Sequence, residues 1–184
     1  AMAGPHPRDP LSLPDEGIDY VAATRLPVEG MRIAYSPDLG VFPVEERVLS
    51  VIEEAVRAFE EAGARVEEAN IEFGRGQREL CELWLREVGV KSAEIVSNLE
   101  DAGVADLLGE HREHLTPEFA ALLDMGHAMG AVEYRKDEVA RTEVFDAIQD
   151  LFDDYDLLVT STLAVPPFDN AGDGNTLGPS KVNG

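Results

Sequence analysis

Cysteine is almost absent from this sequence. The single Cys81 excludes an internal disulfide and a CxxC metal site. Because Cys81 lies beside Leu80 and Trp84 in a helical pattern, we predict a buried thiol in the core rather than a catalytic one. The sequence also lacks a secretory signal and any apolar run approaching the length of a membrane span. We therefore expect a cytoplasmic protein with no membrane partner.

Basic residues are scarce as well. Lysine and arginine together number 15, against 37 aspartates and glutamates, which gives a formal net charge of −22. Such a surface repels nucleic-acid phosphates and anionic lipids, so we expect no direct nucleic-acid partner. Either an acidic interaction module or adaptation to high salt would explain this charge. The acidic residues are spread along the whole chain, which favours adaptation to salt, where concentrated cations screen their repulsion.

Motifs for cofactors and metals are also missing. The GRG at 74–76 lacks the spacing of a phosphate-binding loop and predicts a plain turn. His111 and His114 stand three residues apart among glutamates, which predicts a solvated helix face. Zinc binding at a new site there is the less favoured alternative, because the HEXXH spacing is absent. His127 is expected to be packed or hydrogen-bonded, and the neighbouring Ser and Lys at 180–181 to be a surface pair. We therefore expect no cofactor, no metal and no catalytic residue.

The order of elements predicts an α/β fold, with a small, partly parallel sheet packed with helices. Residues 1–30 read as an extended Pro-rich segment, 31–160 as the α/β domain with a helical middle, and 161–184 as a Gly/Pro-rich loop tail. A strand, a helix beginning near Pro43 and a second strand imply a parallel pair with a right-handed crossover. The strands are expected at 31–35, 65–69 and 156–160.

Hydrophobic spacing predicts the helices and their inward faces. Thr116 and Pro117 mark the start of one helix, as N-cap and first helical residue, and a short helix is expected near 104–113. A longer helix is expected from about 131 to 153, and Gly89 should weaken the middle of the helix that precedes these. The expected inward residues are Val44, Val48, Val51, Ile52, Ala55, Phe59 and Ala62 in the first helix, and Leu80, Trp84, Val88, Ile95 and Leu99 in the second.

Three residues are candidates for substrate binding. Arg141 shares one helix face with apolar residues that include Phe145, so it must meet a carboxylate or a ligand. An internal ion pair is favoured over an anion clamp. Thr160 and Thr162 offer hydroxyls at the end of the third strand, where they would either orient a substrate or cap the loop.

Three segments together resemble the amidase signature family. They are MAGPHPRDPLSLP, the stretch from RIAYSPDLGVFP to AGARVEE, and ARTEVFDAIQDLFDDYDLLVTSTLAVPPFDNAG. The resemblance runs from Met2 to the end of the sequence, and its most specific parts are the strand–helix–strand and the YDLLVT…PP segment. The VTPT usual in the family is VTST here, with Ser161 in place of proline.

This resemblance implies a carboxylic-amide hydrolase that uses a Ser–cis-Ser–Lys triad. The nucleophile of that triad lies in a stretch of the GGSSGGSA kind, and no such stretch occurs in these 184 residues. The expected role is therefore a fragment of an amidase that forms part of the substrate-binding wall and is inactive by itself. Its partners would be an N-terminal amidase half, or further copies of the chain, and a small-molecule amide. In the amidotransferase branch, an arginine resembling Arg141 contacts the substrate's carboxylate.

One alternative function remains at this stage. The chain could be a stand-alone, acidic interaction module that self-associates and needs no catalytic core.

Overall fold

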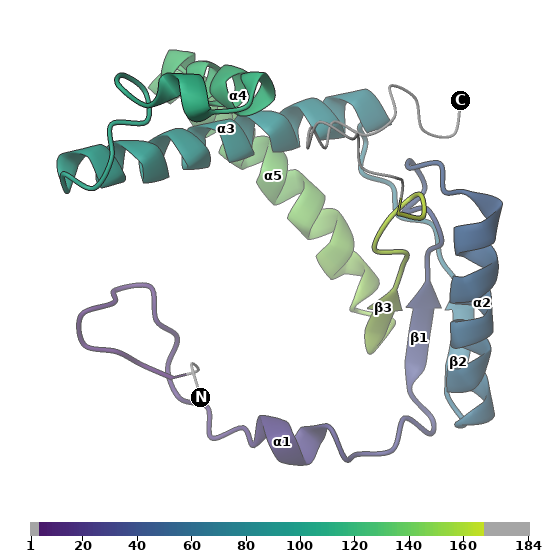
Figure 1. Cartoon of the computed structure of the whole chain (residues 1–184). Coiled ribbons are helices and arrows are strands. Elements are labelled where there is room, and N and C mark those ends of the chain that lie inside the picture. The colour runs from purple at the N-terminus through teal and green to yellow at the C-terminus, as the bar shows by residue number, and fades with distance from the viewer. Residues whose placement is uncertain (1–3, 168–184) are drawn as a thin grey trace.

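The computed structural model describes residues 4–167 and shows a small parallel sheet accompanied by helices (Figure 1). The α/β class and all three expected strands are confirmed. The elements are, in order, α1 (Tyr20–Ala23), β1 (Arg32–Tyr35), α2 (Glu46–Glu61), β2 (Arg65–Glu68), α3 (Gln77–Asp101), a 3-10 turn (Arg112–His114), α4 (Pro117–Ala128), α5 (Ala131–Leu151) and β3 (Leu157–Val159).

The sheet has the strand order β2-β1-β3, and both pairs are parallel. Ile33 of β1 is paired with Val66 of β2 on one side and with Leu157 of β3 on the other. Parallel strands need crossover connections, and here α2 links β1 to β2 while the segment from α3 to α5 links β2 to β3. The central strand β1 is accordingly buried, with Ile33 and Ala34 fully inaccessible.

Helix α2 has the expected helical spacing of apolar residues, but its buried face is narrower than predicted. It begins after Glu45, whose extended backbone caps it, and it ends before Gly63, whose φ of +91° is a left-handed conformation that suits glycine. Val56 is buried, whereas the predicted inward residue Val51 is largely exposed. The prediction for Val51 was wrong because a single helix packing on one sheet edge buries only one narrow stripe.

The core beside β3 is built by three buried residues, Ile71, Phe73 and Leu80. The loop after β1 contributes Leu39, Val41 and Phe42 to this cluster, and β3 contributes Leu158. The C-terminal part of α5 supplies the remaining members. These are Val144, Ala147, Ile148 and Leu151.

Gly89 does more than weaken α3, as it forms a close contact with Gly126 of α4. A Cβ on Gly126 would lie 2.1 Å from the Gly89 carbonyl oxygen, and a Cβ on Gly89 would lie 2.9 Å from the Met125 methyl. The two helices therefore pack backbone to backbone, and Leu123 beside this contact is fully buried. The predicted loss of helix propensity is compensated by packing that only glycine permits.

Several residues of α3 predicted to be inward are exposed. Trp84 is 63% accessible, and Ile95 and Cys81 are also exposed, so the expectation of a buried thiol was wrong. The buried stripe of α3 consists of Leu80, Leu83, Gly89, Ala93 and Val96. One flank of α3 packs on α4 and another contacts α5, whereas the flank that carries Trp84 is exposed in the described part of the chain.

The remaining segments agree with the sequence patterns except at two places. Thr116 caps α4 by accepting a hydrogen bond from the Phe119 N–H, as predicted. The helix expected near 104–113 is only the 3-10 turn Arg112–His114, because residues 102–111 form turns. The extended segment before β1 is interrupted by the single helical turn α1, capped by Asp19. Within residues 4–167, no helix has the length and apolarity needed to cross a membrane.

Candidate functional site

A cavity of about 210 Å³ lies where the loops leave β1 and β3. After β1 the chain forms β2 on one side of β1, and it later forms β3 on the other side. The direction in which strands are added therefore reverses between β1 and β3. A crevice at the carboxyl ends of two such strands is a preferred ligand site in open α/β sheets. Figure 1 shows the loops after β1 and β3 at the same end of the sheet. The lining residues are Asp38, Leu39, Phe42, Val44, Thr160, Ser161, Thr162 and Ala164.

Hydrogen bonds fix the two loops against each other. The Ser161 hydroxyl donates to the Pro37 carbonyl oxygen at 2.7 Å, and the Glu45 N–H donates to the Ala164 carbonyl oxygen at 2.8 Å. The Asp38 carboxylate accepts from the Gly40 N–H at 2.8 Å, which closes the turn after β1. Ser161 therefore has a structural role at the position where the resembling family carries proline.

Thr160 and Thr162 line this cavity, as their position at the end of the third strand suggested. The Thr160 hydroxyl is buried and has no hydrogen-bond partner among the described residues, and Thr162 is an exposed lining residue. Ser36, at the end of β1, also carries a buried hydroxyl without a partner in residues 4–167 and is only 1% accessible. Ser36 and Asp38 were not predicted from the sequence. The signal was available, because parallel pairing of the first and third strands brings the residues after both to one edge.

Arg141 lies away from this cavity. Its guanidinium Nη1 donates to Glu87 of α3 at 3.4 Å, so the arginine has met a carboxylate, as the favoured interpretation required. The face that it shares with Phe145 is exposed, and the Arg141 side chain is 61% accessible. The expectation that this face is buried was wrong at Arg141 and Phe145, whereas Ile148 on the same face packs against the core cluster. Arg141 does not line the cavity with Thr160 and Thr162 in the described part of the chain.

Two further ion pairs join α5 to α3 and to the turn that precedes α3. Arg86 makes a bidentate pair with Asp137, at 2.6 and 2.8 Å, in a partly buried position. This hydrogen bonding to Asp137 raises the pKa of Arg86 above its usual value. Arg75, in the predicted GRG turn, pairs with Glu79 and with Glu143 of α5. Sequence patterns did not identify the pairs to α5, because each joins residues 51 to 68 positions apart.

In the described part of the chain, Tyr35 carries a third buried hydroxyl without a hydrogen-bond partner, and strand alternation places it on the opposite face of the sheet from Ser36. Burial raises the pKa of Tyr35 above its usual value of 10.0. The negative charges of Glu53, Glu68 and Asp38 raise it further. These groups make ionisation of Tyr35 costly, so it stays a neutral hydroxyl at physiological pH.

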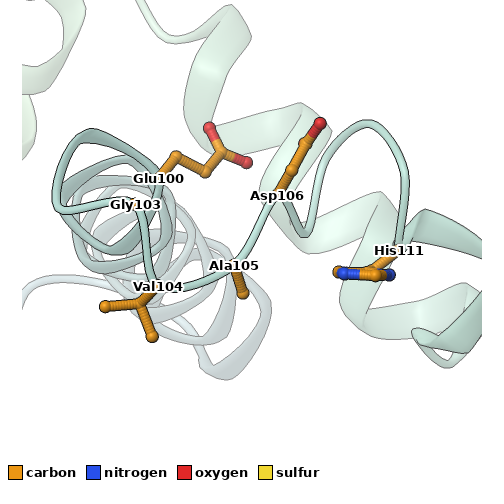
Figure 2. Close-up of a pocket in the computed structure, with 6 residues that line it drawn as sticks. All are labelled: Glu100, Gly103, Val104, Ala105, Asp106 and His111. Atoms are coloured by element: carbon orange, nitrogen blue, oxygen red, sulfur yellow. The ribbon is translucent and has the colours of Figure 1, made fainter.

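The histidines at 111 and 114 do not form a metal site in the described part of the chain. Figure 2 shows His111 at an open cavity, with Glu100 and Asp106 on the other side. Both carboxylates are used by the loop itself. Glu100 accepts from the Leu108 N–H and Asp106 from the Gly109 N–H. No group of three possible metal ligands occurs within residues 4–167.

The remaining candidates are peripheral or lie outside the described residues. His127, expected to be packed or hydrogen-bonded, is exposed in the last turn of α4. The Ser–Lys pair at 180–181 lies outside the described residues, as does most of the predicted tail 161–184.

Comparison with known proteins now gives the family. The family model described as Amidase matches residues 1–183. An acylamidase from Rhodococcus erythropolis is 30% identical over 167 residues, which is 91% of this chain and 33% of the relative. The structure of a bacterial aryl acylamidase of the amidase signature family superposes with a TM-score of 0.88 and 34% identity, covering 98% of this chain and 36% of that one.

A more distant structure agrees in fold alone. A glutamyl-tRNA(Gln) amidotransferase component from Thermotoga maritima aligns with a TM-score of 0.51 and 17% identity, over 93% of this chain and 36% of that one. The chain spans about a third of the length of the relatives that it matches. With its parallel β2-β1-β3 sheet and the family match over nearly every residue, the chain belongs to the amidase family.

Proposed function

We propose that this chain forms part of the substrate-binding wall of a carboxylic-amide hydrolase and does not hydrolyse amides by itself. The supporting observation is the cavity at the carboxyl ends of β1 and β3, lined by Thr160 and Thr162. The similarity to acylamidases supports an amide substrate, and the anilide bond suggested by the aryl acylamidase is the first substrate class to test. A small-molecule amide and a complementary amidase portion are the partners of this proposal.

The lack of independent activity follows from chemistry. Amide hydrolysis by a serine needs a group that removes the hydroxyl proton during attack. The resembling family supplies it through a Ser–Ser–Lys relay in a Gly/Ser-rich stretch, and these 184 residues contain no such stretch. In the described part, the buried Ser36 and Thr160 hydroxyls have no hydrogen-bond partner that could act as a base.

A chimera tests this proposal. Residues 4–167 would replace the matching third of the aryl acylamidase, and release of 4-nitroaniline from 4-nitroacetanilide would be measured. We expect turnover by the chimera and none by the unaided chain. Thr160→Val in the chimera should lower kcat/KM, whereas Ser50→Ala, at an exposed position of α2, should not. A chimera that melts cooperatively but is inactive would contradict the proposal, as would turnover by the unaided chain.

Arg141 has its own place in this proposal. We propose that its guanidinium contacts a polar part of the substrate in the complete enzyme, since Glu87 uses only Nη1 at a long 3.4 Å and the side chain is exposed. Arg141→Lys in the chimera keeps the charge but loses the planar donor set, so a rise in KM is expected. An unchanged KM would leave Arg141 as the ion-pair partner of Glu87 alone.

Exposed apolar side chains favour one second candidate, a self-associating module. Trp84 of α3 and Val139 and Phe145 of α5 are large and exposed, and monomeric proteins rarely leave many such groups uncovered. The net charge of −22 opposes close approach of two copies at low salt. Sedimentation equilibrium in low and molar KCl separates the candidates, because a stable dimer without activity in the chimera supports the module.

The acidic composition supports a proposed setting. We propose a cytoplasmic enzyme of a salt-adapted cell, in which molar cations screen the repulsion among 37 acidic residues.

A further inference from the structure

A leucine in the left-handed conformation lies in the wall of the cavity at the ends of β1 and β3. Leu39 has a φ of +55°, and the next residue, Gly40, has a φ of +75°. The Asp38 carboxylate accepts from the Gly40 N–H at 2.8 Å, which closes a tight turn. The Asp38 carbonyl oxygen accepts from the Phe42 N–H at 2.9 Å. These hydrogen bonds hold Leu39 in its conformation.

The left-handed conformation is costly for leucine. There the Cβ of an L-residue crowds a backbone carbonyl oxygen, whereas glycine has no Cβ and asparagine tolerates the region. Strained residues persist where the surrounding structure over-determines them, and they are frequent at binding sites. A leucine at a position that suits glycine therefore indicates that its side chain contributes something that outweighs the strain.

The Leu39 side chain lies between the cavity and the core. It lines the cavity, and it packs against the buried core cluster beside β3. The turn is also seated closely on the loop after β2, because a Cβ on Gly40 would lie 2.2 Å from Asn70 Oδ1 and 3.0 Å from the Ile71 carbonyl oxygen. Since close-packed interiors yield little, Leu39 is supported from behind and cannot retreat from an occupant of the cavity.

The loop after β3 supplies another wall of the cavity and is fixed as well. Thr162 and Ala164 line the cavity from this loop. The Ser161 hydroxyl donates to the Pro37 carbonyl oxygen, just before the turn at Leu39. The N–H of residue 45, after that turn, donates to the Ala164 carbonyl oxygen. With both loops tied together, the room of about 210 Å³ is set by side chains rather than by loop movement.

We infer that Leu39 is a specificity-determining residue, whose side chain limits the size of the substrate group that this cavity admits. Leu39 is partly exposed, so an occupant can contact it, and the core behind it prevents it from yielding. The inference deepens the proposed function, and it rests on that function in treating the cavity as part of the substrate wall.

Melting temperatures of the purified chain test the left-handed turn. Leu39→Ala and Leu39→Gly both lose the packing of the leucine side chain, but only glycine relieves the strain. Leu39→Gly should therefore melt at the same or a higher temperature than Leu39→Ala, which is the opposite of the order in a helix or strand. A lower melting temperature for Leu39→Gly would show that residue 39 is not held left-handed and would overturn the inference.

Size preference in the chimera tests the role of the side chain. Two series of anilides are compared by release of the aniline: 4-nitroanilides with acyl groups from acetyl to hexanoyl, and acetanilides with ring substituents of increasing size. In one of the two series, Leu39→Ala should raise kcat/KM for the larger members relative to the smallest by at least about tenfold. A general loss of folding would lower kcat/KM for all members alike.

Two control variants separate volume from other effects. Leu39→Met conserves the side-chain volume and should keep the size preference. Val51→Ala shortens an exposed apolar side chain on α2 and should keep it too. An active chimera in which Leu39→Ala leaves the preference unchanged in both series would overturn the inference.

Probe binding to the purified chain decides the inference without catalysis. Phenol and 4-tert-butylphenol are uncharged probes that differ in size, and their binding is followed by shifts of the amide signals of residues 38–44 and 160–164 in ¹H–¹⁵N spectra. Leu39→Ala should strengthen the binding of 4-tert-butylphenol relative to phenol at least about tenfold. An unchanged ratio, or no binding of either phenol to any variant, would overturn the inference. An inactive chimera together with the expected change in this ratio would contradict the proposed function alone.

Discussion

Substituting Gly126 by alanine tests how α3 and α4 are held together. The new Cβ would lie 2.1 Å from the Gly89 carbonyl oxygen and 2.5 Å from its carbonyl carbon, and both are backbone atoms that cannot rotate away. Ordinary contact begins at 3.4 Å, so the helices must separate by about 1.3 Å. The matched variant is Gly89→Ala, whose Cβ meets the flexible Met125 methyl at 2.9 Å and the Leu122 carbonyl oxygen at 3.1 Å.

The magnitude follows from two opposing effects. Overpacking of a well-packed interface costs about 3 kcal/mol at the upper end of its usual range, since the obstacle is backbone. Alanine recovers about 1 kcal/mol of helix propensity, so Gly126→Ala should lose about 2 kcal/mol of unfolding free energy. In a chain of this size, that loss lowers Tm by roughly 4–8 °C. Gly89→Ala should lose less, because the Met125 side chain can move and the Leu122 carbonyl oxygen, at 3.1 Å, is only about 0.3 Å inside ordinary contact distance.

Urea unfolding followed by circular dichroism measures both variants on the purified chain. The reasoning is refuted if Gly126→Ala is as stable as the unmodified chain, or if the two alanine variants are equally destabilised. Either outcome would mean that the glycine contact does not set the distance between α3 and α4.

Three further predictions concern charge. The pKa of Tyr35 is raised in the fold, so the unfolded chain loses the Tyr35 proton first as pH rises. The contribution of Tyr35 to stability is therefore complete below pH 10 and is lost as pH rises above it. In urea midpoints measured from about pH 8 to 11, Tyr35→Phe should remove part of this fall. Asp137→Asn should cost about 1–3 kcal/mol in molar KCl, because it breaks the bidentate pair with Arg86, and an unchanged urea midpoint would contradict this role. The melting temperature of the chain should climb with KCl up to molar concentrations, and a flat response would remove the argument for salt adaptation.

Local signals in the sequence predicted the elements of this fold well. Alternation and capping residues such as Thr116 act over a few positions, so they can be read without knowing the partner segments. The parallel pairing of β1 with β2 followed from the helix between these two strands. What helical periodicity could not give was which face is covered. Trp84 and Phe145 have the spacing of a core, yet both are exposed, because nothing in the described chain packs over them.

The candidate site was predicted only in part, for a related reason. Thr160 and Thr162 were found because a strand ending in hydroxyls is a local pattern. Ser36 is far from Thr160 in the sequence, and only the register between β1 and β3 unites them. The apolar face of α5 predicted an internal ion pair for Arg141, with a pocket-facing clamp as the less favoured alternative, but the partner Glu87 lies 54 positions away on α3 and was not identified from the sequence.

The central claim is that this chain forms part of a substrate-binding wall and does not catalyse amide hydrolysis by itself. Its most direct measurement is the release of 4-nitroaniline from 4-nitroacetanilide by the chain alone and by the chimera, at equal concentration in molar KCl. The account predicts a rate equal to the enzyme-free blank for the chain and clear turnover for the chimera. Turnover by the chain alone that disappears when one of its own serines is replaced would contradict it.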